Sequence, residues 1–248
     1  MKKTMIGIGN FFFRFRNQAF PVIIVGLLLI AWPRFEILGS HFLEEATDLI
    51  ALSVVLAGLI FRATVIGYAY IKRGGLNKKV YAKDLVTGGM FGLCRNPLYV
   101  GNMLIYSGVF LMHGNLWVLA FGIAMFAFIY QCIIYAEEAF LENKFGDGYR
   151  AYCQDVPRWI PHFGKFAQST EGMEFNVKRV IAKDYSTTCA ALIALIAVEA
   201  GEYLATPDPT QHLGYLSVLT ALMVGVGVLT GAISVLKKRG VFNDGKPA

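Results

Sequence analysis

The chain has 248 residues, of which 56% are hydrophobic and only 16% are charged, and its formal net charge is +6. An average soluble domain carries about 25% charged residues, so this composition argues against a soluble globular protein. The basic residues lie in short clusters between apolar blocks, which is typical of membrane topology and contact with anionic lipids rather than of nucleic-acid binding.

Six apolar blocks follow one another along the chain. A membrane-spanning helix needs about 20 apolar residues, with a range of about 17–25. Block 98–112 is short, the first block is long enough only if it extends over 18–38, and the fifth carries Glu199 and Glu202. In lipid every block must be helical to satisfy its own backbone polar groups. We therefore predict an all-α, polytopic membrane protein with about six spans: 21–32, 49–71, 98–112, 115–136, 186–205 and 213–236.

The N-terminal region resembles a signal peptide, because two lysines precede an apolar run. No small-residue cleavage site follows Trp32, so we expect an uncleaved first span. Residues 5–20 contain several phenylalanines and two arginines, a composition that predicts an interfacial helix leading into the membrane.

Charge placement predicts the orientation. The loops at 41–48, 113–115 and 206–212 contain neither lysine nor arginine, whereas every basic cluster falls on the other side of a six-span arrangement. The positive-inside rule then places both termini in the cytoplasm, which in a bacterium means a multi-pass inner-membrane protein. The clusters are Lys2, Lys3, Arg14 and Arg16, then Lys72, Arg73, Lys78, Lys79, Lys83 and Arg95, and finally Lys237, Lys238 and Arg239.

Isolated features inside the blocks receive simpler interpretations. The four cysteines lack paired spacing and the four histidines are isolated, so neither set predicts a metal site. Arg62 lies inside the second block, where an ionisable residue is expensive and often functional, and it is expected either in a site or in an ion pair. Gly225, Gly227 and Gly231 predict a helix-packing face in the last block.

Two signatures flank the third and fourth blocks. A glycine-rich stretch over 84–92 leads into Arg95-Asn96-Pro97, and Pro97 suits the first turn of a helix because no amide donor is needed there. A helical hairpin turning at 113–115 would return Glu137-Glu138 to the same face as Arg95. The apolar side chains that follow recur at helical spacing and predict an amphipathic helix lying back over the site: Leu141, Phe145, Tyr149 and Tyr152.

These motifs resemble a known superfamily. The pattern Val86-Thr87-x-Gly89-x-Phe91, Arg95-Asn96-Pro97-x-Tyr99-x-Gly101, Glu137-Glu138-x-x-Leu141 and Phe145-Gly146-x-x-Tyr149-x-x-Tyr152 is similar to that of the isoprenylcysteine carboxyl methyltransferases and phospholipid methyltransferases. The resemblance covers a methyltransferase core (82–161), which leaves an N-terminal interfacial helix with two spans (1–81) before it and a linker with two added spans (162–248) after it. It implies integral membrane enzymes that bind S-adenosylmethionine under cytoplasmic loops and admit a lipophilic acceptor laterally.

The residue types suit that cofactor. Arg95 can hold its carboxylate through a bidentate fork, Glu137 and Glu138 can bind its ammonium and hydroxyls, and aromatic rings can face its sulfonium. Family members usually have histidine in place of Asn96, and asparagine cannot take a proton near neutral pH. The expected catalytic residues are Arg95, Asn96, Glu137 and Glu138. The expected cofactor-binding residues are Val86, Gly89, Phe91, Arg95, Asn96, Pro97, Tyr99, Glu137, Glu138 and Tyr149, and Arg62 and Arg158 are expected to contact substrate.

The resulting prediction is methyl transfer by direct displacement to a lipophilic acceptor drawn from the bilayer, with S-adenosylhomocysteine as the second product. A lipid amine, a prenylated-cysteine-like carboxylate and a small hydrophobic acceptor remain open. One alternative is an NADPH-dependent sterol-type reductase, but its extra phosphate calls for basic residues after the fourth span, where this chain has two glutamates. The other alternative is a non-catalytic membrane scaffold or transporter.

Overall fold

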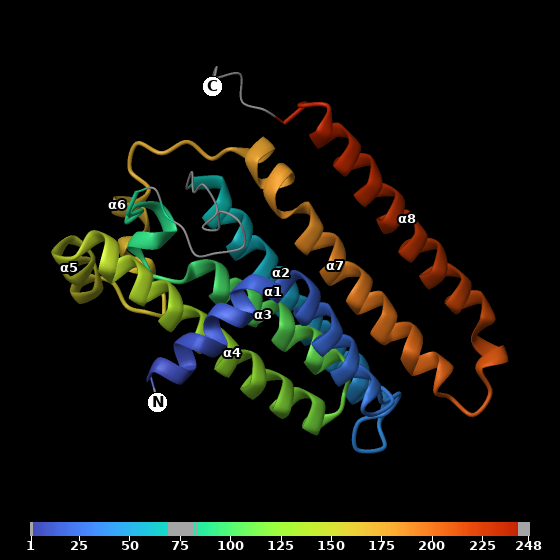
Figure 1. Ribbon diagram of the computed structural model, residues 1–248. Coiled ribbons are helices and arrows are strands. Elements are labelled where there is room, and N and C mark those ends of the chain that lie inside the picture. Colours follow the sequence, from blue (N-terminus) through green and yellow to red (C-terminus); the bar gives the residue numbers. More distant parts are fainter. Residues whose placement is uncertain (1, 69–81, 83, 243–248) are drawn as a thin grey trace.

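A computed structural model describes residues 2–68, 82 and 84–242, and regular structure in this part of the chain is helical (Figure 1). The predicted basic residues Lys72, Arg73, Lys78, Lys79 and Lys83 lie outside the described residues. The α-helices are α1 (Lys2–Leu29), α2 (His41–Tyr68), α3 (Pro97–Met112), α4 (Leu116–Phe145), α5 (Asp147–Asp155), α6 (Phe166–Ser169), α7 (Val177–Leu204) and α8 (Leu213–Lys238). Short 3-10 helices are η1 (Gly89–Gly92), η2 (Phe163–Lys165) and η3 (Pro209–His212).

Five helical segments are long and apolar enough to cross a membrane, which confirms a polytopic helical protein. They are α1, α2, α4, α7 and the segment Pro209–Lys238 that contains α8. Helix α3 has 16 residues, or roughly 24 Å of helix, whereas the hydrocarbon core is about 30 Å thick. The expected third span is therefore the shortest of the set.

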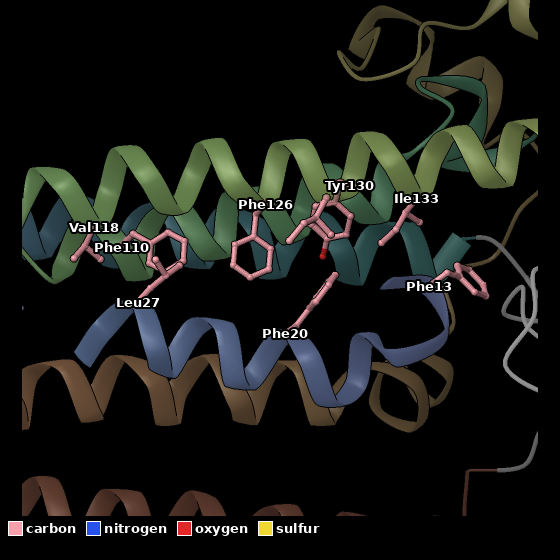
Figure 2. Packing of buried hydrophobic residues seen from close by; sticks show 9 residues of the cluster. Phe13, Phe20, Leu27, Phe110, Val118, Phe126, Tyr130 and Ile133 are labelled. Atoms are coloured by element: carbon pink, nitrogen blue, oxygen red, sulfur yellow. The ribbon is translucent and has the colours of Figure 1, made fainter. Parts of the chain in front are cut away.

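Helix α1 differs from the prediction. It runs unbroken from Lys2 to Leu29, so the expected interfacial helix over 5–20 and the first span are one element that ends well before residue 38. Phe13 and Phe20 are buried against α4 rather than left at a membrane surface, as Figure 2 shows. Their aromatic area is removed from solvent by the neighbouring helix, which removes the reason for a separate surface helix.

The aromatic layer between α1 and α4 forms the largest apolar cluster (Figure 2). The Phe20 ring meets Phe126 edge-on with centroids 5.3 Å apart, and it meets Tyr130 in the same manner at 5.6 Å. Phe110 reaches into this layer from α3. The layer fixes α1 across the α3–α4 hairpin, so the N-terminal helix closes one side of the bundle.

Small residues let α2 and α3 pack closely. A Cβ atom at Gly58 would lie 2.8 Å from the carbonyl oxygen of Gly101, and one at Gly101 would lie 2.5 Å from Arg62 Cγ. Close backbone approach through small residues is a common basis of helix association in membranes. Gly101 of the second signature thus serves packing between helices.

Helix α8 lies along α7 at the edge of the molecule (Figure 1). Leu219 is its one buried residue in the described chain. A Cβ atom at Gly225, Gly227 or Gly231 would meet no described atom within 4 Å. The helix-packing face predicted for these glycines therefore meets no other helix among the described residues, because α7 contacts a different side of α8.

Two glycines two positions apart, on different faces of α1, provide a test of this packing. A Cβ atom at Gly9 would lie 2.0 Å from the carbonyl oxygen of Cys132, whereas one at Gly7 would meet nothing within 4 Å. We expect Gly9→Ala to destabilise the protein by about 1–3 kcal/mol through overpacking. Gly7→Ala should be neutral or slightly stabilising, because alanine favours helix. Thermal unfolding in detergent measures both, and equal melting temperatures would contradict the α1–α4 contact.

Candidate functional site

The α3–α4 hairpin brings the two signatures together. Pro97 occupies the first turn of α3, and Asn115 caps α4 by accepting hydrogen bonds from the amides of Trp117 and Val118. Helix α4 then returns to the end where α3 began. As a result Arg95 Nη1 lies 3.1 Å from Glu138 Oε1, although the two residues flank opposite ends of the hairpin sequence.

Glu138 is the centre of an ion-pair network. Arg158 binds it through two parallel hydrogen bonds, Nε to Oε1 at 2.8 Å and Nη2 to Oε2 at 2.9 Å. The backbone amide of Arg95 also donates to the carbonyl of Pro157 at 2.8 Å. These contacts join the start of α3, the end of α4 and the segment after α5. Two guanidinium groups thus neutralise Glu138.

Helix α5 covers the site, but it is shorter than predicted. Gly146, with φ of +52°, ends α4, so Leu141 and Phe145 belong to α4 and only Tyr149 and Tyr152 to α5. A positive φ is readily accepted by glycine. Both tyrosines are buried in a cluster with Leu141 and Phe145, and the Tyr152 hydroxyl donates to the carbonyl of Phe91 at 2.7 Å.

A cavity of about 840 Å³ lies between the helices and this cover. Small-molecule sites typically occupy about 300–1,000 Å³. Most predicted site residues line the cavity: Arg62, Val86, Phe91, Arg95, Asn96, Pro97, Tyr99, Glu137, Glu138 and Tyr149. Gly89 and Arg158 do not. The carbonyl of Gly89 accepts a hydrogen bond from Ser169 at 2.5 Å, and Arg158 is engaged by Glu138 and lies over the Tyr135 ring.

The two adjacent glutamates have different surroundings. Glu137 accepts a hydrogen bond from the Tyr99 hydroxyl at 2.9 Å, and Arg16 of α1 lies close enough to interact with it electrostatically. Glu138 is held by Arg95 and Arg158. Glu137 therefore retains carboxylate capacity toward the cavity, whereas Glu138 chiefly orients the two arginines.

Arg95 carries an unsatisfied donor. Its Nη1 contacts Glu138 and lies 2.6 Å from Cys153 Sγ, while its buried Nε has no hydrogen-bond partner among the described residues. Leaving a buried donor unpaired costs about 1–3 kcal/mol. An acceptor bound in the cavity would remove that cost, so the geometry suits an anionic or carbonyl group of a ligand.

The Asn96 side chain forms a hydrogen bond with the backbone. Its Nδ2 donates to the carbonyl oxygen of Arg158 at 3.0 Å, which ties the start of α3 to the segment after α5. An amide has no proton-accepting chemistry near neutral pH. The geometry therefore gives Asn96 a positioning role beside the cavity and no role as a base.

Burial keeps one thiol and two phenols near the cavity protonated at physiological pH. Burial raises the pKa of the Cys94 thiol to about 11, and burial likewise raises the pKa of Tyr149 and of Tyr152 above the ordinary tyrosine value. Cys94 is fully buried and is absent from the cavity wall. These groups provide neither a thiolate nor a phenolate for nucleophilic chemistry.

Arg62 joins α7 to the site. Its guanidinium binds both carboxylate oxygens of the buried Asp184, and its Nη1 donates to Asn102 Oδ1 at 2.5 Å. Arg62 also lines the cavity, so it both forms an ion pair and contributes to the wall. Helix α7, which belongs to the two added spans, takes part in the cavity wall and supplies these residues: Arg179, Lys183, Ser186, Thr187, Ala190, Ala191 and Ala194.

Sequence reasoning missed several cavity residues. Arg16 was assigned to a membrane surface, and Asn102 and Tyr130 are single polar groups inside apolar blocks. Asn102 Nδ2 donates to the Tyr130 hydroxyl at 2.7 Å, and the Tyr99 and Tyr130 rings stack with centroids 4.8 Å apart. A polar residue within a predicted span was the available signal for both.

Comparisons with known proteins match the region of the chain that contains these residues. The sequence profile of the phospholipid methyltransferase family matches residues 45–148, which include α3 and the ion-pair residues Arg95 and Glu138. This chain belongs to the superfamily of phospholipid and isoprenylcysteine methyltransferases. No solved structure is significantly similar to it.

Three curated proteins are similar to part of this chain. The protein-S-isoprenylcysteine O-methyltransferase of Schizosaccharomyces pombe is 38% identical over 31% of this chain and 33% of its own length. Protein-S-isoprenylcysteine O-methyltransferase B of Arabidopsis thaliana is 31% identical over 44% of this chain and 57% of its own. The cobalt-zinc-cadmium resistance protein CzcN of Cupriavidus metallidurans is 35% identical over 33% of this chain and 38% of its own. In each case the match spans less than two thirds of the relative.

The ion-pair network predicts a stability effect. Glu138→Gln removes the charge that binds Arg95 and Arg158, and we expect a loss of about 1.5–3 kcal/mol, the range for hydrogen bonds to charged groups. Glu142→Gln is the matched control on the same helix, since its contact with Arg150 at 3.6 Å is half-exposed and such pairs contribute at most about 1 kcal/mol. Thermal unfolding in detergent compares them, and an unchanged Glu138→Gln variant would argue against the network.

Proposed function

We propose that the protein is an S-adenosylmethionine-dependent methyltransferase that acts on a lipophilic acceptor. The observation that carries this proposal is the unpartnered Nε of Arg95 in a cavity that Glu137 also lines. An anion-binding donor and a carboxylate on one wall suit the carboxylate and ammonium of the cofactor's amino-acid arm. Membership of the superfamily supports the same chemistry.

The chain's residues fit that cofactor with divided roles. Arg95 would hold the cofactor carboxylate, and Glu137 would hold its ammonium. The stacked pair of Tyr99 and Tyr130, with Phe91 on the cavity wall, provides aromatic faces for adenine or the cationic sulfur. Glu138 is the positioning residue that orients Arg95.

Bound S-adenosylmethionine would supply an electrophilic methyl group for direct displacement. The protein's contribution is then to hold acceptor and donor in line and to exclude water, which accounts for much of the acceleration in such reactions. Tyr149 and Tyr152 of α5 close the end of the cavity with buried rings. Neither Asn96 nor a cysteine thiolate is needed as a base when the acceptor is already an anion.

The inner part of the cavity supports a lipophilic acceptor. Its walls there are apolar and come from α3 and α7: Ile105, Val109, Phe110, Ala190, Ala191 and Ala194. Apolar area removed from water contributes about 25 cal/mol per Å². An acyl, prenyl or other hydrophobic group would bind there, with its reacting atom toward Glu137. A lipid amine, a prenylated-cysteine-like carboxylate and a small hydrophobic acceptor all satisfy this geometry.

Six spans with both termini in the cytoplasm are part of the proposal. Successive helices in the series α1, α2, α3, α4, α7 and α8 run in opposite directions, so the start of α1 and the end of α8 fall at the same end of the bundle as the cavity cover (Figure 1). Arg16, Lys183 and Lys237 lie toward that end. The positive-inside rule then makes it the cytoplasmic end, where S-adenosylmethionine is available.

Cofactor binding tests the assignment of the two glutamates and separates it from a reductase. Glu137→Gln should weaken binding of labelled S-adenosylmethionine about 10- to 100-fold, the equivalent of one charged hydrogen bond. Its melting temperature should stay near that of the wild type. Glu142→Gln should bind normally. Binding of NADPH in place of S-adenosylmethionine would favour the reductase, and binding of neither would favour a scaffold or transporter.

Product formation tests the acceptor. The purified protein, supplied with methyl-labelled S-adenosylmethionine and a total membrane extract, should transfer label to an organic-soluble product. Glu137→Gln should reduce the transfer by at least the loss in cofactor binding. Label confined to water-soluble compounds would refute the lipophilic acceptor while leaving methyl transfer intact.

A further inference from the structure

Three carboxylates converge at the end of the bundle opposite the cavity. Glu44 and Asp48 lie one turn apart on α2, and Glu202 lies near the end of α7. One carboxylate oxygen from each residue lies within 4.8 Å of the other two. Asp184, which binds Arg62 beside the cavity, is 18 residues earlier on α7 than Glu202, or roughly 27 Å of helix. None of the three acids lines the cavity.

Two of these acids are almost fully buried. Glu202 is 1% exposed and Glu44 is 5% exposed. Glu202 Oε1 has no hydrogen-bond donor among the described residues, and Glu44 Oε2 is reached only by the imidazole of His41, at 2.8 Å. Burying an unpaired carboxylate is costly, and burying several side by side adds their mutual repulsion. Positive charge at the centre of the cluster, from a bound cation or from protons that the acids share, would offset both costs.

The described residues provide little of that charge. His41 contacts Glu44 at 2.8 Å and the exposed Glu45 at 3.5 Å, and no described lysine or arginine forms an ion pair with the three acids. The neighbouring Glu199 is also acidic and accepts a hydrogen bond from the Tyr215 hydroxyl of α8 at 2.8 Å. Asp184, at the other end of α7, is by contrast neutralised by Arg62.

We propose that Glu44, Asp48 and Glu202 bind a hard divalent cation such as Mn²⁺, Mg²⁺ or Ca²⁺. All three ligands are carboxylate oxygens, which these cations prefer, and water can complete the coordination. His41 beside Glu44 would act as an outer-shell group that orients the ligand. Arg62 and Asp184 link α2 to α7 beside the cavity. The cation would link the same two helices at the opposite end of the bundle. Cysteine and histidine spacing gave no sign of this site, because its ligands are acidic and come from two distant segments.

Metal titration of the full-length protein in detergent tests the site. After EDTA treatment and desalting, the wild type should bind one equivalent of Mn²⁺, seen as loss of the free-ion electron paramagnetic resonance signal. Its melting temperature should rise as Mn²⁺ is added. Glu202→Gln should bind Mn²⁺ at least tenfold more weakly and lose that rise. Glu45→Gln, which removes a 66% exposed acid from the same end of α2, should behave as the wild type.

Comparing the wild type and the variants without metal separates loss of metal binding from loss of folding. Glu202→Gln relieves repulsion, so in EDTA it should fold and melt no lower than the wild type, and Asp48→Asn should reproduce its Mn²⁺ phenotype. Wild-type protein that shows neither binding nor a thermal shift with Mn²⁺, Mg²⁺ or Ca²⁺ would overturn the site. An equal shift in wild type and Glu202→Gln would place the ion elsewhere and also overturn it. Binding of S-adenosylmethionine should be the same in both proteins, so this test is independent of the proposed function.

Discussion

The salt bridges at Glu138 hold the candidate site together. Arg95 precedes α3, Glu138 lies near the end of α4, and Arg158 follows α5, so one carboxylate joins three segments that are separate in sequence. The hydrogen bonds from the Arg95 amide to Pro157 and from Asn96 to the Arg158 carbonyl add to the same junction. Because the charges are partly buried, their attraction is stronger than on an open surface. The cover over the cavity is thereby fixed relative to the hairpin.

This network gives the two adjacent glutamates, Glu137 and Glu138, different roles. Adjacent acids in a sequence look equivalent, but these two differ. Arg158 binds the Glu138 carboxylate through two hydrogen bonds, whereas the Glu137 carboxylate accepts a hydrogen bond from Tyr99 and lies beside the cavity. Glu138 is committed to Arg95 and Arg158. The same contacts leave Arg95 Nε buried and unpartnered, a cost that the protein accepts at a binding site and that a ligand acceptor can offset.

How much could be predicted from the sequence depended on whether the signal was local. Pro97 and Asn115 sit at the helix starts that their residue types favour, so the hairpin could be predicted. The ion pair between Arg62 and Asp184 joins residues 122 positions apart, so the position of Arg62 in an apolar block predicted an ion pair or a site but could not identify Asp184 as the partner. The cavity position of Arg16 was missed because an arginine among phenylalanines is typical of a membrane surface, whereas here its neighbours Phe13 and Phe20 pack on α4 and Arg16 lines the cavity.

Helix lengths explain why the site is recessed. Helices α3 and α4 meet at one turn, but α3 has 16 residues and α4 has 30, so α4 projects roughly 20 Å beyond its partner. Glu137 and Glu138 lie on this projecting part, and the segment before α3 folds across it together with α5. A charged ligand arm would therefore meet Arg95 and Glu137 below the level of the longer helices, while a hydrophobic group continues inward between α3 and α7. Helix α3, which comes from a block that is short for a membrane span, would create the space in which the two can meet.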